Sequence, residues 1–377
     1  MAVNADLPAE LRLLSLGCDV QPSEEKQKRL CDRFTQSLNS KRVLDLAVRH
    51  GTAGLLYKNL SHAGCLEHLG TLAERLRDLY LVTAGRNLKL IHALQQTLDR
   101  LEHENIPVVV VQGTALLGSV YPDIGMRPLA DVDLWIPTDL AKAIRMLVDS
   151  GYHPGHLYPH TLAKGDVTFD LHSHLLWADR IQSRRWLMGV DPADVFGRAR
   201  PATIAGCQTL VLDPADQVIY LCLHALKHNL NRLIWLIDLK ISVAHWTGGQ
   251  WAALWDRAES WGQTRAVFVV LQLVQDLLQV DLRDGLGLAQ APVLSLPERT
   301  SVRLARAQAQ MPWWGALVWL KPAGAPVRRP ILMLESLFPK PGILGQVFPL
   351  KAGRCSAVLY ALRLWQLVCH IVRHLRV

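Results

Sequence analysis

The sequence lacks several features that would place it in a class at once. Its seven cysteines are scattered and include no Cys-x-x-Cys pair, so neither a disulfide framework nor a thiolate zinc site is expected. Internal repeats and low-complexity runs are absent. The opening residues, MAVNADLPAELRLL, show no basic stretch followed by an apolar run, which argues against a secretory signal. Reduced thiols and a cytoplasmic location are therefore expected.

Acidic residues are scarce in one region of the chain. Residues 312–377 hold nine Lys or Arg against a single acid, Glu335, whereas basic and acidic residues balance over residues 1–311. The net charge of +8 is therefore a property of the C-terminal segment.

A final helix is expected over about residues 355–375, with a wide apolar face and several basic residues. It allows contact with an anionic surface, but a core helix with solvated basic ends is the favoured interpretation. Arg363 and His370 interrupt the apolar run, so a transmembrane span is not expected.

The rest of the chain has enough apolar residues to fold, since half of all residues are hydrophobic. Residues 1–105 show helical periodicity, and a long helix is expected over 72–104. Three short segments then show strand patterns, at 107–111, 131–136 and 167–172.

A helix is expected between the second and third strands, from Asp139 to Ser150, with Thr138 as its cap and Gly151 at its end. Residues 201–212 predict a hairpin that turns near Gly206.

Asp213 and Pro214 then open a helical region, which extends to about residue 275 with a break at Gly248-Gly249. Pro-rich connections are expected after it. The pattern predicts an α+β fold. A small mixed-sheet core at 106–178 lies between a helical region at 1–105 and a linker, hairpin and helical region at 179–311, with the basic segment at 312–377.

Asp131 and Asp133 are the most informative residues for chemistry. Residues two apart on a strand point to the same face, where two carboxylates repel each other unless a cation lies between them. Oxygen ligands suit Mg²⁺, which usually also contacts substrate phosphates. Asp170, on the third strand, supplies a third carboxylate for one or two ions.

Other residues near this pair favour phosphate binding. Gly113 and Thr114 follow the first strand, and a glycine turn there exposes N–H groups to a triphosphate. Arg127, just before the aspartates, has the charge to meet phosphate. A polar stripe on the helix after Pro214 is equally well explained by nucleotide contact and by a solvated face. Its members are His224, His228, Asn231, Arg232, Trp235 and Asp238.

The run VVVVQGTALLGSVYPDIGMRPLADVDLWIP resembles the core motif of the uncharacterised nucleotidyltransferase family, within the DNA polymerase beta superfamily. The later segments VTFDLHSHLLW and LCLHALKHNLNRLIWLIDLKISV resemble its third-carboxylate segment and its C-terminal helix. Two N-terminal segments, LAVRHGTAGLLYKNL and RNLKLIHALQQTLDRLEHENIP, also match, so the resemblance covers about residues 40–245.

This resemblance implies transfer of a nucleoside monophosphate from ATP or another triphosphate to an unknown acceptor, with Mg²⁺ or Mn²⁺. The acceptor is a small molecule, a peptide, a protein or an RNA end. Asp131, Asp133 and Asp170 would be the catalytic metal ligands. The nucleotide would contact Gln112, Gly113, Thr114, Arg127, His224, His228 and Arg232.

One residue departs from the family pattern, which usually has Lys where this chain has Gln112. Glutamine cannot neutralise phosphate charge, so a second hypothesis is a catalytically weakened nucleotide- or partner-binding module in a biosynthetic pathway. A third is a zinc hydrolase that uses His224 and His228, or His172 and His174 with Asp170. No HExxH motif or complete ligand set supports it.

Overall fold

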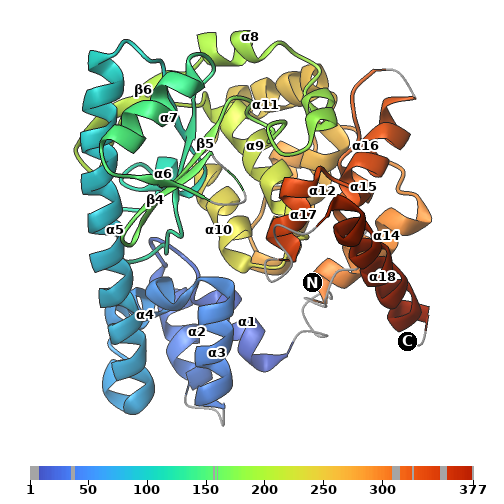
Figure 1. The fold of residues 1–377 in the computed structure, drawn as a ribbon. Coiled ribbons are helices and arrows are strands. Elements are labelled where there is room, and N and C mark those ends of the chain that lie inside the picture. The colour runs from blue at the N-terminus through green and yellow to red at the C-terminus, as the bar shows by residue number, and fades with distance from the viewer. Residues whose placement is uncertain are drawn as a thin grey trace.

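The computed structural model describes residues 8–34, 39–155, 158, 160–307, 315–324, 327–348 and 355–375. N-terminal helices lead into a seven-stranded sheet, and a second group of helices follows it (Figure 1). The predicted α+β class is therefore confirmed.

The N-terminal part consists of short helices and one long one. They are α1 (Ala9–Leu16), α2 (Glu24–Phe34), α3 (Ser40–His50), α4 (Ala53–His62), the 3-10 helix η1 (Leu66–His68) and α5 (Thr71–His103). Helix α5 contains no Pro, so it continues for 33 residues, and it runs along the sheet (Figure 1). The long helix predicted over 72–104 is confirmed.

The sheet mixes parallel and antiparallel pairs, in the spatial order β3-β4-β5-β2-β1-β7-β6. Its strands are β1 (Val109–Val111), β2 (Val132–Trp135), β3 (His153–Pro154), β4 (Thr161–Lys164), β5 (Val167–His172), β6 (Arg200–Ile204) and β7 (Cys207–Val211). The three predicted strands are its centre. The predicted hairpin is β6 and β7, and β7 pairs with β1, so the sheet extends beyond the core expected at 106–178.

Parallel pairing of β2 with β5 sets Asp133 directly opposite Asp170. The flanking residues Leu134, Phe169 and Leu171 are fully buried and hold both strands in this register. Adjacent strands lie about 4.8 Å apart, so the two carboxylates project from neighbouring backbones.

Short helices connect these strands: α6 (Gln112–Leu116), α7 (Leu140–Asp149), η2 (Gln182–Leu187) and α8 (Pro192–Gly197). The predicted Thr138 cap of α7 is wrong, because Asp139 takes the N-cap position in a left-handed conformation, without a side-chain hydrogen bond. Gly151 follows the helix with a φ of 85°, as its predicted role requires.

The predicted helical region after Pro214 is interrupted earlier than expected. Asn229 and Leu230 adopt left-handed conformations (φ 56° and 54°) and separate two helices, α9 (Pro214–Lys227) and α10 (Leu233–Ser242). The predicted cap of α9 is confirmed, since Asp213 accepts a hydrogen bond from Ala215 N.

Helices also fill the region where Pro-rich connections were expected. The remaining elements are α11 (Gly248–Trp261), α12 (Thr264–Leu278), α13 (Arg283–Leu286), α14 (Leu296–Arg306), α15 (Gly315–Trp319), α16 (Arg328–Leu337), α17 (Pro341–Val347) and α18 (Ser356–Leu375). Helix α18 confirms the final helix. Within the described ranges, no helix is long and apolar enough to cross a membrane.

The expectation of reduced thiols is wrong for one pair. Cys31 in α2 and Cys65 just before η1 form a disulfide, with Cα atoms 5.9 Å apart. Their 34-residue separation gave no indication that they meet, because spacing along the chain does not report distance in the fold. Five other cysteines are free: Cys18, Cys207, Cys222, Cys355 and Cys369.

A buried ion pair joins the loop before β2 to α10. Arg127 Nε and Nη2 donate to the two oxygens of Asp238 at 2.9 and 2.7 Å, and the Tyr121 hydroxyl donates to the same carboxylate at 2.7 Å. Burial opposes the charge on Arg127, but the Asp238 carboxylate outweighs it and raises the pKa of Arg127. Asn87 of α5 donates to the carbonyls of Ile124 and Arg127, so three parts of the fold meet at this loop.

Replacing Asp238 with Asn keeps its shape but leaves the buried Arg127 without a counter-charge. We expect Asp238→Asn to lower the free energy of unfolding by about 3–5 kcal/mol, measured by urea denaturation. Asp281→Asn is the control, because Asp281 pairs with Arg283 at an exposed site and should change little. Equal losses in the two variants would contradict the role assigned to the buried pair.

Candidate active site

A cavity of about 290 Å³ opens where the centre of the sheet faces the ends of α9 and α10. It brings together predicted site residues that lie more than a hundred positions apart in the chain. Those that line it are Gln112, Gly113, Arg127, Asp131, Asp133, Asp170, His224, His228 and Arg232. Thr114, also predicted, is buried, with its hydroxyl unpartnered among the described residues.

The floor of the cavity holds a compact group of potential metal ligands. One ligand atom each from Asp133, Asp170 and His172 lies within 4.8 Å of the others, and all three residues are buried. His172 Nε2 is 3.2 Å from Asp133 Oδ1 and 3.6 Å from Asp170 Oδ2. The two strands thus bring Asp133 and Asp170 together as predicted, and His172 joins them.

Asp131 lies beside this group, just before β2 begins. Burial and the neighbouring carboxylates of Asp133 and Asp170 raise its pKa to about 7. Negative charge is therefore concentrated enough to oppose further ionisation, a situation that a divalent cation relieves.

Gln112 and Gly113 occupy the turn between β1 and α6. Gln112 has a left-handed φ of 55°, and its Nε2 donates to Asp133 Oδ1. It therefore contacts one of the candidate metal ligands directly. A Cβ on Gly113 would lie 1.9 Å from Arg127 Nη1, so glycine is required there by the close packing of that arginine.

Arg127 lines the cavity, but its guanidinium is engaged by Asp238. Asp238, a member of the predicted polar stripe, is therefore the partner of Arg127 and is not on a solvated face. The predicted phosphate contact of Arg127 therefore competes with a buried ion pair.

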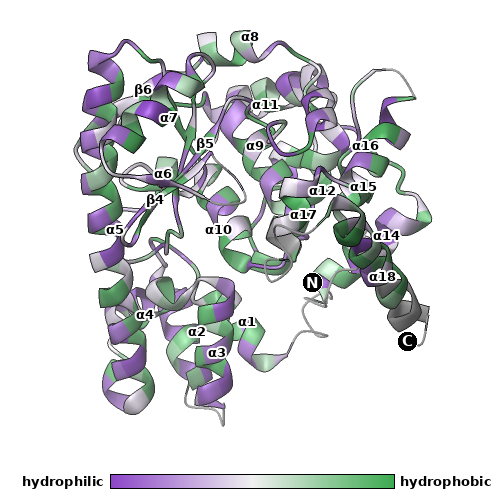
Figure 2. Ribbon diagram, in the orientation of Figure 1, coloured by the Kyte–Doolittle hydropathy of each residue, from purple (hydrophilic) through white to green (hydrophobic). Residues whose placement is uncertain are grey.

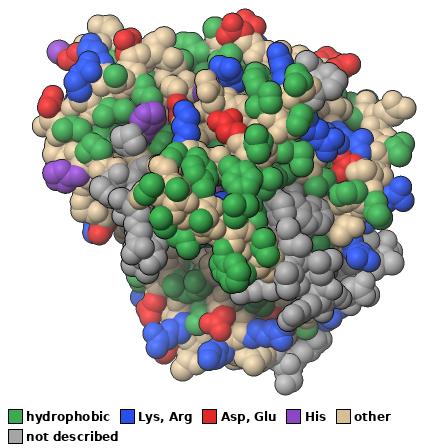
Figure 3. All heavy atoms as spheres, turned by 45° about the vertical axis from the view of Figure 1, so that its right-hand side comes forward, with side chains coloured by type: hydrophobic (Ala, Val, Ile, Leu, Met, Phe, Trp, Pro, Cys, Tyr) green, Lys and Arg blue, Asp and Glu red, His purple; other side chains and the backbone are tan. Residues whose placement is uncertain are grey.

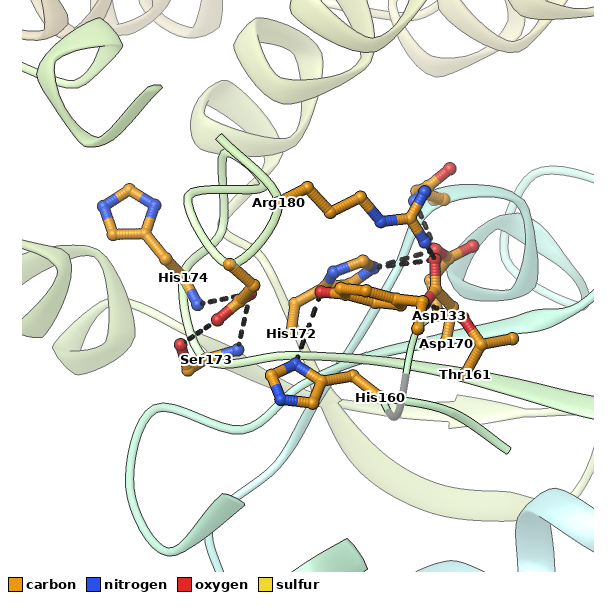
Figure 4. A network of polar contacts seen from close by, with 11 residues as sticks. Asp133, His160, Thr161, Asp170, His172, Ser173, His174 and Arg180 are labelled. Carbon is orange, nitrogen blue, oxygen red and sulfur yellow. Dashed lines mark hydrogen bonds and ion pairs between the residues drawn. The ribbon is translucent and has the colours of Figure 1, made fainter. Parts of the chain in front are cut away.

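Arg180 is a residue that the sequence analysis missed. Its Nη2 donates to Asp170 Oδ2 at 2.6 Å, and its guanidinium lies 4.4 Å above the ring of Tyr158. Asp179 accepts hydrogen bonds from Ser173 and so closes the turn that brings Arg180 back to the carboxylates. Figure 4 shows Arg180 and His172 converging on Asp133 and Asp170. Arg180 belongs to a polar stretch that was interpreted as a linker, which hid it.

Lys227, at the end of α9, is the second missed residue. It lines the cavity without an ion-pair partner among the described residues, and its Nζ lies 4.0 Å from the ring centre of Trp177. Burial, followed by repulsion from Arg184 and Arg180, lowers its pKa well below the usual range. It comes three residues after His224, so helical spacing alone places it on the predicted stripe.

Some buried guanidinium N–H groups of residues that line the cavity have no acceptor in the described part of the protein. They are Arg180 Nε and Arg232 Nε; the buried His224 Nδ1 also has no partner, and it donates in only one of the two tautomers of the neutral ring. Burial and nearby positive charge lower the pKa of His224, and bring that of His228 to about 3, so both rings are neutral. Buried donors without acceptors are costly, and an anion in the cavity would satisfy them.

An aromatic cluster forms the outer edge of the same wall. The ring centroids of His224, His228 and Trp235 lie 4.7–5.4 Å apart. The helix break brings Trp235 from α10 against two histidines at the end of α9, although all three were predicted to share one helix.

The zinc-hydrolase hypothesis gains no support. His174 points away from Asp170, beyond Ser173 (Figure 4). Among the described residues, the one group of three potential ligands is that of Asp133, Asp170 and His172, so His224 and His228 lack a third ligand.

Paired carboxylates on a central sheet, faced by a wall of basic donors, are typical of proteins that transfer phosphate-containing groups. A family described as uncharacterised nucleotidyltransferase matches residues 36–279, about two thirds of the chain. The chain belongs to this nucleotidyltransferase family, which confirms the resemblance. No curated protein and no solved structure matches it.

The raised pKa of Asp131 predicts an effect on stability. In unfolded chains the pKa of an aspartate is about 3.9. Between that pH and about pH 7, Asp131 is therefore protonated in the folded state and ionised in the unfolded state. Ionisation of Asp131 therefore destabilises the fold progressively as the pH rises through this window. In EDTA at pH 8, Asp131→Asn should raise the free energy of unfolding by on the order of 1–2 kcal/mol, allowing for solvent screening.

The gain should disappear as the pH falls toward 4. The control is Asp166→Asn, because Asp166 is an exposed aspartate. Urea denaturation across this pH range tests both variants, and an Asp131→Asn gain that does not depend on pH would refute the electrostatic explanation.

Proposed function

We propose that this protein transfers a nucleoside monophosphate from ATP or another nucleoside triphosphate to an acceptor hydroxyl or similar nucleophile, with release of pyrophosphate. One observation carries the proposal: a single cavity has carboxylates crowded on one wall and basic donors without acceptors on the other. A divalent cation with a polyphosphate satisfies both walls together.

Asp131, Asp133 and Asp170 are the proposed ligands of Mg²⁺ or Mn²⁺, with His172 next to them. Their buried oxygens and the raised pKa of Asp131 fit a doubly charged ion with oxygen ligands. The bound ion would neutralise the phosphates and the leaving pyrophosphate. Gln112 and Thr161 hold Asp133 and Asp170 in place through hydrogen bonds.

Arg180, Lys227 and Arg232 are the proposed phosphate ligands. Lys227 supplies positive charge in the same cavity as Gln112, the position where the family pattern has Lys. Its ammonium is desolvated and repelled by neighbouring arginines, so a phosphate nearby would favour its charged form. Trp235 and His228 provide ring faces at the edge of the cavity on which a base can stack.

In the proposed reaction the acceptor oxygen bonds to the α-phosphorus while the bond to the bridging oxygen of the β-phosphate breaks. Asp170 takes the proton of the acceptor hydroxyl, and Arg180, already within 2.6 Å of Asp170, keeps that carboxylate oriented. Lys227 and Arg232 contact the pyrophosphate as it leaves and offset its negative charge.

A cytoplasmic location follows from the supply of triphosphates there, and the Cys31–Cys65 disulfide is unusual for that compartment. Nucleotide binding without turnover stays the alternative, because Gln112 contacts Asp133 where a lysine would add charge.

Thermal stability with nucleotides tests the proposal. With Mg²⁺ and a preferred triphosphate at about a hundred times its dissociation constant, the folded state should gain about 2.7 kcal/mol. ATP, GTP, CTP and UTP are each compared with and without the metal. The gain should require both components and should vanish in the Asp131→Asn/Asp133→Asn double variant.

Two lysine variants test the proposed phosphate ligands separately from the proposed metal ligands. Lys227→Met should abolish the gain from nucleotide without lowering the stability of the free protein, because it removes an unpaired, partly buried charge. Lys142→Met, which alters an exposed lysine on α7, is its control. Stabilisation by none of the four triphosphates would refute nucleotide binding. Stabilisation without release of pyrophosphate, when cell extract supplies acceptors, would favour the binding module.

A further inference from the structure

Helix α18 turns an apolar face to solvent. Val358, Leu364, Trp365 and Val368 are 37%, 52%, 69% and 50% exposed. At 100° per residue, these positions and the exposed Ala361 lie within about 120° of the helix circumference. The buried Leu359 and Leu367 lie outside this stripe. The favoured expectation of a core helix therefore holds for only one side of α18.

Helix α16 presents a similar surface nearby. Ile331, Met333 and Leu334 are 40–62% exposed. Two hydrogen bonds link α18 to the end of α16 and the residues that follow it: Arg363 Nε donates to Leu337 O at 2.9 Å, and the Tyr360 hydroxyl donates to Pro339 O at 3.1 Å. Figures 1 and 2 show both helices on the side of the molecule opposite α5, with hydrophobic positions along them.

The chain segment that contains these helices is basic. Residues 312–377 hold nine Lys or Arg and one acid, and among the described residues Arg329 and Lys340 are exposed there. The one acid, Glu335, accepts hydrogen bonds from the backbone of Gln182 and Ser183, so its carboxylate is directed toward η2. Figure 3 turns this side forward and shows hydrophobic side chains gathered on it, with Lys and Arg beside them.

We propose that α16 and α18 dock the protein onto an anionic lipid surface, with Leu364, Trp365 and Val368 inserted among the lipids. Apolar and indole side chains on a helix enter the boundary between headgroups and acyl chains, and basic residues nearby attract anionic headgroups. A second copy of this chain is a poorer occupant, because two segments of the same charge would repel each other. Nucleic acid would meet the charge but leave the apolar stripe exposed to water. This surface is distinct from the nucleotidyltransferase site.

Co-sedimentation of the full chain with vesicles tests the proposal. The protein should bind vesicles of phosphatidylcholine mixed with phosphatidylglycerol, and should bind phosphatidylcholine alone more weakly. Leu364→Gln with Trp365→Gln should reduce the partition coefficient about tenfold or more. Glutamine favours the helix, and both positions are exposed, so the fold is kept.

Two further variants complete the design. Leu81→Gln with Leu88→Gln removes two exposed leucines from α5 and should leave binding unchanged. Arg329→Gln with Lys340→Gln should weaken binding to the anionic vesicles and reduce its dependence on salt.

Three outcomes would overturn the proposal. The first is that the protein binds neither type of vesicle. The second is that it binds both types equally, with or without phosphatidylglycerol. The third is a concentration-dependent increase in mass by analytical ultracentrifugation that the Leu364→Gln/Trp365→Gln variant abolishes, which would assign the stripe to a second copy.

Discussion

The contact between Arg127 and Asp238 constrains the rest of the site. A charged pair removed from water is tolerated only with complete hydrogen bonding, and Tyr121 supplies the third bond here. The pair fixes the loop that leads into β2, and with it the position of Asp131. It also accounts for Gly113, because the guanidinium fills the space that any Cβ would occupy. The turn after β1, the acidic strand and α10 are therefore positioned by one buried interaction.

The cavity itself is built from groups that destabilise one another. Burial, and then the neighbouring carboxylates, raise the pKa of Asp131, while burial, and then two arginines, lower that of Lys227. Each of these two groups is therefore in surroundings that disfavour its charged form. Arg180 bridges the two sets by donating to Asp170. Binding sites commonly retain such unfavourable electrostatics, because a ligand of opposite charge recovers the lost stability when it binds.

Much of this arrangement was predictable from local pattern. The strands, the long helix and the hairpin follow from hydrophobic periodicity and turn residues. The alternation of acidic and apolar residues around Asp133 and Asp170 indicated which face of each strand carries the carboxylate. The break at Asn229 and Leu230 was not predictable, because helical spacing of apolar residues continues across it and its left-handed conformations depend on tertiary packing. Arg180 and the Cys31–Cys65 pair escaped prediction because both depend on where the chain returns in space. Strands β3 and β4 are short and mostly exposed, so they carry little hydrophobic pattern.

The parallel pairing of β2 with β5 has a consequence for the shape of the cavity. The spacing of Asp133 and Asp170 is set by the hydrogen bonds between the two strands and not by the chain that joins them. The part of the connection before β4 is therefore not what sets their spacing, whereas Thr161 on β4 contacts Asp170 directly. Because Thr161 also lines the cavity, a change in β4 would alter the shape of the cavity while the paired strands keep the two aspartates opposite each other.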